Sequence, residues 1–194
     1  MSAFFADPSW VALHIGDNLR FIRPAESHHA FGAGFLLIGA MMSAETLTGR
    51  VWHRSQVRSL MFPATLVMLG WGMMIVTAVE PNARIVHLSM GVPMIAGGWA
   101  EARSRLDGFP RRYADLFIVP GLVLASLDTV FYHLNGPPTN PVLITHVCLA
   151  IVAVTIGGLR LYQSASPQSL TRGLMVSAGV LAVGCSLWID AFFQ

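Results

Sequence analysis

The chain has 194 residues, of which 54% are hydrophobic and only 11% are charged, whereas a typical soluble domain has roughly 25% charged residues. This composition excludes an ordinary soluble globular protein and predicts a polytopic membrane protein. All 12 basic residues are arginine, so mechanisms that need a protein lysine, such as retinal or pyridoxal Schiff bases, are excluded. The net charge of +2 gives no indication of a nucleic-acid partner.

The first 23 residues predict an amphipathic helix that lies on the membrane surface. Apolar residues between Pro8 and Arg23 recur at helical spacing, and the charged residues lie off that stripe. The first eight residues contain no Lys or Arg, so we do not expect a secretory signal peptide. We expect residues 1–23 to form an interfacial segment and residues 24–194 to form one transmembrane domain.

Six apolar stretches follow, each close to the roughly 20 residues with which a helix crosses a bilayer. They are 28–48, 59–79, 83–100, 114–134, 142–161 and 172–193. Pro24, Pro81 and Pro141 stand just ahead of the first, third and fifth stretches, where a missing backbone N–H costs little. The predicted fold is therefore an all-α bundle of six transmembrane helices arranged as three hairpins.

The arginines are unevenly distributed between the two sides of this bundle. Three lie on the side of the termini, and nine flank the loops after the first, third and fifth helices: Arg50, Arg54, Arg58, Arg103, Arg105, Arg111, Arg112, Arg160 and Arg172. Loops rich in arginine stay in the cytoplasm. We therefore expect a multi-pass protein of the bacterial cytoplasmic (inner) membrane with both termini outside.

A repeat connects the three odd-numbered helices. His28, His87 and His146 are evenly spaced, since 87 − 28 = 59 and 146 − 87 = 59. A Gly or Ala follows each of them four residues later, and a Gly eleven residues later. Because the three helices run in the same direction, the histidines should lie at one depth, about one turn below the outer surface. His29 would lie beside this ring.

Histidines and carboxylates at this depth predict a metal or haem site, because ionisable groups in a membrane span are costly and usually functional. Three histidines and a carboxylate suit Cu, Fe or Zn, whereas two facing histidines suit b-type haem. The candidate cofactor-binding residues are His28, His29, His87 and His146, with one of the first two as the ligand. The candidate metal ligands are His87, His133, His146 and Asp128.

Other polar and sulfur-containing residues are interpreted more simply. Asp190 ends the last helix on the same face as the histidines, and solvation is favoured there over a role as a ligand. Glu45 and Glu101 close helices on the cytoplasmic side and are expected to pair with nearby arginines. Met90 and Met94 share a helical stripe with His87 that would suit Cu(I), although methionine more often fills a core.

The leading hypothesis is a membrane protein that binds a transition metal or haem b near its outer face. The chemistry would be metal handling, or electron transfer with quinone or a periplasmic partner. A first alternative is a non-catalytic accessory subunit of a larger membrane complex. A second is a membrane-embedded enzyme for a lipid-soluble substrate, with Asp128 or His133 as acid or base. The expected partners are thus the lipid bilayer, other membrane subunits or quinone.

Overall fold

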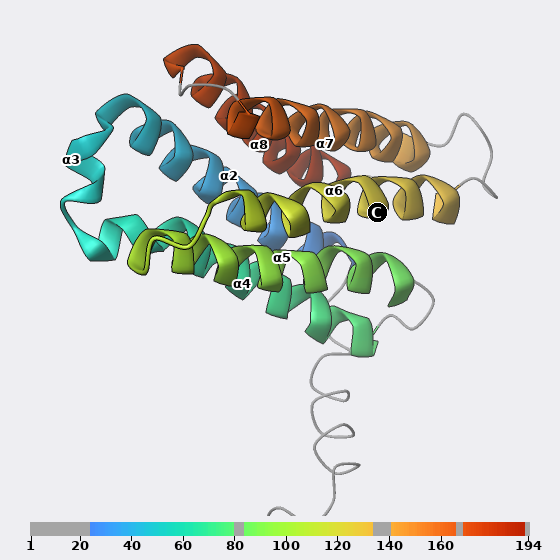
Figure 1. Ribbon diagram of the computed structural model, residues 1–194. Helices are drawn as coiled ribbons and strands as arrows, with labels where there is room; N and C mark the ends of the chain where they lie inside the picture. The colour runs from blue at the N-terminus through green and yellow to red at the C-terminus, as the bar shows by residue number, and fades with distance from the viewer. Residues whose placement is uncertain (1–23, 80–83, 134–140, 166–168, 193–194) are drawn as a thin grey trace, which may run out of the picture.

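The computed structural model describes residues 24–79, 84–133, 141–165 and 169–192. They form six long helices and one short helix (Figure 1): α2 (Pro24–Thr48), α3 (Arg50–His53), α4 (Gln56–Val79), α5 (Arg84–Leu106), α6 (Arg112–His133), α7 (Pro141–Ala165) and α8 (Leu170–Asp190). These residues contain no strand, so the all-α prediction is confirmed for them. The predicted surface helix in residues 1–23 lies outside the described residues.

Four helices are long and apolar enough to cross a membrane. The spans are Glu26–Thr48 in α2, Gln56–Thr77 in α4, Leu143–Tyr162 in α7 and Leu170–Asp190 in α8. The other two long helices, α5 and α6, have 23 and 22 residues, which also suffices in length for a bilayer. The chain is therefore a helical protein with the composition of a membrane protein.

The six long helices form a closed ring. Each contacts the next one along the chain, and α8 returns to contact α2. The contact between α2 and α8 is far more extensive than that between α2 and α4, and α4 packs mainly on α5. The tightest pairs thus join helices from different predicted hairpins, so the arrangement as three hairpins is not confirmed.

Glycines of the histidine repeat explain these tight pairs. A Cβ atom added at Gly32 would lie 3.0 Å from the backbone oxygen of Gly184, and one added at Gly91 would lie 2.9 Å from the backbone oxygen of Gly70. Any side chain there would push the helix backbones apart. The glycines one turn after His28 and His87 therefore permit the close approach of α2 to α8 and of α5 to α4.

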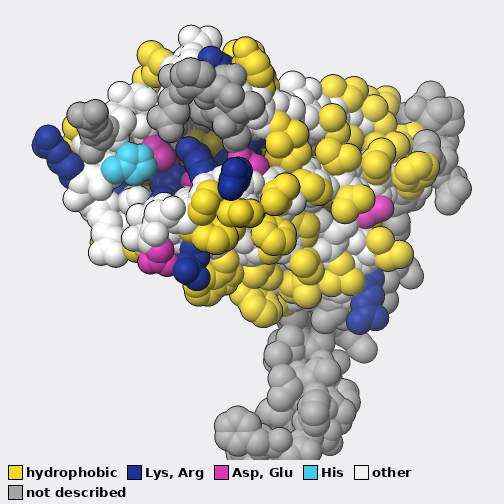
Figure 2. Space-filling view, viewed as in Figure 1, with side chains coloured by type: hydrophobic (Ala, Val, Ile, Leu, Met, Phe, Trp, Pro, Cys, Tyr) yellow, Lys and Arg dark blue, Asp and Glu magenta, His cyan; other side chains and the backbone are white. Residues whose placement is uncertain are grey.

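The surface has one polar end and an apolar flank. Charged side chains gather around α3 and the neighbouring helix ends, and hydrophobic side chains cover the flank in this view (Figure 2). Large apolar residues on the long helices are widely exposed, including Met68 at 72%, Ile85 at 73% and Phe131 at 64%. An apolar surface of this extent is typical of helices that face lipid.

Candidate functional site

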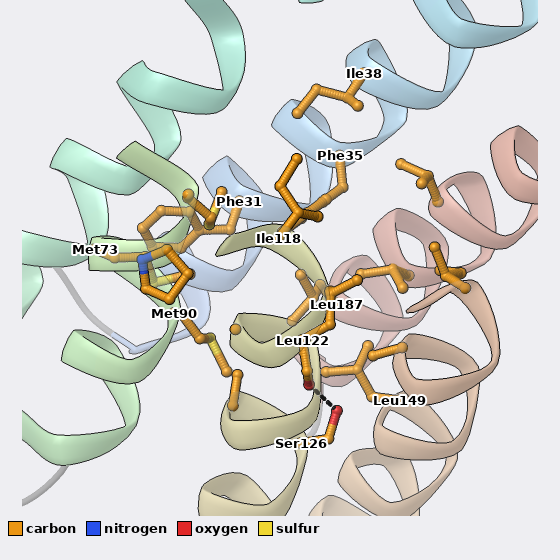
Figure 3. A pocket seen from close by; sticks show the side chains of 18 of the residues that line it. Phe31, Phe35, Ile38, Met73, Met90, Ile118, Leu122, Ser126, Leu149 and Leu187 are labelled. Carbon is orange, nitrogen blue, oxygen red and sulfur yellow. Dashed lines mark hydrogen bonds between the residues drawn. The ribbon is translucent and has the colours of Figure 1, made fainter. Parts of the chain in front are cut away.

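A cavity of about 480 Å³ lies inside the ring, and all six long helices contribute to its wall. Apolar side chains line most of it, among them Phe31, Ile118, Leu122 and Leu149 from three helices (Figure 3). On α7 the lining residues run from His146 to Arg160, which corresponds to about 21 Å along a helix. The cavity therefore follows the axis of the bundle and has a different polar group at each end.

The three repeated histidines lie at the same end of this cavity. His28 on α2, His87 on α5 and His146 on α7 all line it, each in the first two turns of its helix. The equal spacing in the sequence thus corresponds to positions at a common depth in the ring. The fold thus brings these imidazoles to one end of the cavity. Their role as ligands stays a prediction.

Two of these histidines share one carboxylate. One donor atom from each of His28, His146 and Asp190 lies within 4.8 Å of the others. His28 Nδ1 is 3.5 Å from Asp190 Oδ2, and His146 Nδ1 is 3.8 Å from Asp190 Oδ1. The two imidazole rings meet edge to face, with centroids 6.0 Å apart. We call these three residues the His–Asp cluster.

The His–Asp cluster is shielded from water. The side chain of Asp190 is 1% exposed, that of His146 is 7% exposed and that of His28 is 23% exposed. Burial of a carboxylate is costly without compensation by hydrogen bonds, opposite charge or a metal. The expectation that Asp190 is solvated is therefore wrong, because α8 packs along α2 and brings this residue against both imidazoles.

The other predicted ligands lie elsewhere or are only partly described. His87 lines the cavity but is not part of the His–Asp cluster. His29 packs against Trp188 and Phe192, with ring centroids 5.0 and 5.5 Å apart. Asp128 is partly exposed and is not among the residues that line the cavity. The side chain of His133 lies outside the part of the chain that the structure describes.

An ion-pair network closes the opposite end of the cavity. Arg160 donates to Glu101 Oε2 at 3.0 Å and also to Asp115. Arg105 donates to Glu101 Oε1 at 2.8 Å and to Glu45 Oε2 at 3.0 Å. These five residues come from four helices, and Glu101, Asp115, Arg160 and Arg105 are nearly inaccessible to solvent. The predicted pairing of Glu45 and Glu101 with arginine is confirmed.

The sequence interpretation missed two members of this network. Arg160 counts among the loop-flanking arginines by position, but its side chain is 6% exposed and lines the cavity. Asp115 lies in the first turn of α6 and has no predicted role in the sequence analysis. The available signal was the presence of an arginine and an aspartate within otherwise apolar stretches, because such groups are rarely left unpaired in a membrane span.

Comparison of the chain with known protein families, with curated proteins and with solved structures finds no match.

Proposed function

We propose that this protein binds one transition-metal ion at the His–Asp cluster, near the outer face of the bacterial cytoplasmic membrane. The observation that supports the proposal is the convergence of two imidazoles and one carboxylate from three helices within 4.8 Å. Such a donor set, with open positions left for water or a substrate, is a known arrangement for Fe(II) and Zn²⁺. Either ion would suit metal handling, whereas electron transfer would require iron, because Zn²⁺ does not change its oxidation state.

The spacing of the donor atoms suits a metal ion. Two bonds of about 2.1 Å at a tetrahedral angle hold their donor atoms about 3.4 Å apart. The separations of 3.5 Å and 3.8 Å from the imidazoles to Asp190 are close to that value. Each imidazole thus lies near that distance from an oxygen of Asp190, and the three donor atoms, which lie within 4.8 Å of one another, would draw together to bind one ion.

A metal ion fits this geometry better than haem b does. In haem with two histidine ligands, the imidazoles bind from opposite faces of the macrocycle, which must lie between them. Here both Nδ1 atoms approach the same carboxylate, so Asp190 lies where the two rings converge. The donors are nitrogen and oxygen without sulfur, which favours Fe(II) or Zn²⁺ over Cu(I).

The proposed orientation in the membrane places the His–Asp cluster on the outer side. All six long helices would span the bilayer, with the arginine-rich ends in the cytoplasm and both termini outside. The His–Asp cluster lies at the opposite end from the ion-pair network that contains Arg105 and Arg160. It would then face the outer leaflet, where an ion can exchange with the periplasm.

Metal analysis of the purified full chain tests this function. The wild-type protein, purified in detergent without chelator, should carry about one Fe or Zn ion per chain. The variants His146→Ala and Asp190→Asn should each lose most of the metal, because removal of ligands or of their immediate partners typically weakens metal binding at least 10- to 100-fold.

The matched control is His29→Ala. It removes a histidine from the same helix and the same turn as His28, but one that packs on Trp188 and Phe192. Its metal content should equal that of the wild type. No stoichiometric metal in the wild type, or equal loss in all variants, would contradict the proposal and favour the accessory-subunit hypothesis. A Soret band would show haem in place of the ion.

A further inference from the structure

The cavity itself suggests a second ligand, different from the metal ion. It extends about 21 Å along α7, from His146 to Arg160, and its volume of about 480 Å³ falls within the roughly 300–1,000 Å³ of small-molecule sites. A metal ion would occupy only the end where His28 and His146 lie. The remaining space has the length and the volume for an elongated organic molecule.

The side chains that line the cavity favour a neutral ligand with a long apolar part. Between its two ends the lining side chains are apolar, among them Phe35, Leu149 and Ile156. Among the described residues, Arg160 is the one arginine in the lining, and its guanidinium already pairs with Glu101 and Asp115. An anionic ligand would therefore compete with two buried carboxylates for this cation, which disfavours acidic lipids.

The histidine end provides a different surface, suited to a flat polar head group. Phe31, Met73 and Met90 lie near one another on one side of the cavity (Figure 3), and aromatic and thioether groups pack well against planar rings. The imidazole of His87 lines the same end and can donate a hydrogen bond to a carbonyl oxygen.

We propose that the cavity binds a lipid-soluble quinone, with its ring beside His87, Phe31 and Met90 and its apolar tail extended toward Arg160. A neutral ring with carbonyl oxygens matches the histidine end, and an isoprenoid or alkyl tail matches the apolar wall. The proposal goes beyond the metal site. Its main determinants, His87 and the wall at Ala153, are not members of the His–Asp cluster.

Direct binding of a benzoquinone that carries a decyl tail tests this inference. The full chain in nanodiscs should bind the radiolabelled probe saturably, at one site per chain, and unlabelled probe should displace it. Ala153→Leu fills the cavity from α7 and should weaken binding about tenfold or more. His87→Leu removes one buried hydrogen bond, and about tenfold weaker binding is expected.

Two sets of control variants distinguish binding in the cavity from binding elsewhere, and the quinone site from the metal site. Ala64→Leu makes the same substitution on an exposed face of α4 and should bind the probe as the wild type does. Asp190→Asn should lose the metal but bind the probe within about threefold of the wild type, whereas Ala153→Leu should retain the metal. Failure of one proposal is thereby distinguished from failure of the other.

Three outcomes would overturn the quinone proposal. The first is binding that does not saturate in the wild type. The second is equal affinity in the Ala153→Leu and Ala64→Leu variants, which would place the probe in the surrounding lipid. The third is displacement of the probe by oleate as effective as that by unlabelled quinone, which would show an acyl-chain site without recognition of the ring.

Discussion

Replacement of Arg160 by methionine should strongly destabilise the bundle. The substitution Arg160→Met keeps much of the apolar stem but removes a guanidinium that donates to Glu101 and Asp115. Hydrogen bonds to charged groups contribute about 1.5–3 kcal/mol each, so two of them amount to about 3–6 kcal/mol. Independently, removal of one partner from a buried ion pair typically costs about 3–5 kcal/mol. We therefore expect a loss of about 3–5 kcal/mol in the free energy of unfolding.

Reversible unfolding in mixed micelles of a mild detergent and SDS, followed by circular dichroism, measures this loss. The matched control is Arg103→Met. Arg103 pairs with Asp107 on the surface, where the two side chains are 59% and 51% exposed, and exposed pairs contribute about 0–1 kcal/mol. A double variant, Arg160→Met with Asp115→Asn, should lose less than the sum of the two single losses because the residues interact directly.

Two results would refute this reasoning. Equal losses for Arg160→Met and Arg103→Met would show that burial does not strengthen the pairs of Arg160. A more stable Arg160→Met variant would show that the cost of desolvating the guanidinium exceeds the stabilisation by its two carboxylate partners.

Two further predictions concern helix packing and membrane topology. Gly91→Ala places a Cβ atom 2.9 Å from Gly70 O and should lower the free energy of unfolding by about 1–3 kcal/mol. The control is Gly158→Ala, which should be neutral or slightly stabilising because a Cβ atom there meets nothing within 4 Å. Equal effects would contradict the role of Gly91 in bringing α4 and α5 together. Alkaline phosphatase, which is active only outside the cytoplasm, should be active when fused after residue 194 and inactive when fused at Gly108. Activity at Gly108 would contradict the six-span topology, because this position would then lie outside.

The histidine repeat shows how far the sequence alone could predict the site. Equal spacing of His28, His87 and His146 requires only that three helices run in parallel, and all three residues line one cavity. The repeat could not identify which imidazoles share a ligand, because that depends on lateral packing. In the structure His28 and His146 approach Asp190, and His87 lines the wall apart from them.

Asp190 and Arg160 could not be assigned from their positions in the chain. Asp190 ends the last helix, where solvent exposure is the usual expectation, but α8 closes the ring against α2 and buries it. Arg160 lies near a predicted loop, but its pairs with Glu101 and Asp115 connect residues 59 and 45 positions away. Such distant partners are determined by which helices are neighbours, and hydropathy carries no information about that.

The sequence by itself determined the helical class, the apolar character expected of a membrane protein and the common depth of the repeated histidines, because composition and periodicity act locally along each helix. Only the tertiary structure decided the order of helices around the ring, the shared carboxylate and the central cavity. These features depend on contacts between helices far apart in the sequence, such as that of Gly32 in α2 with Gly184 in α8.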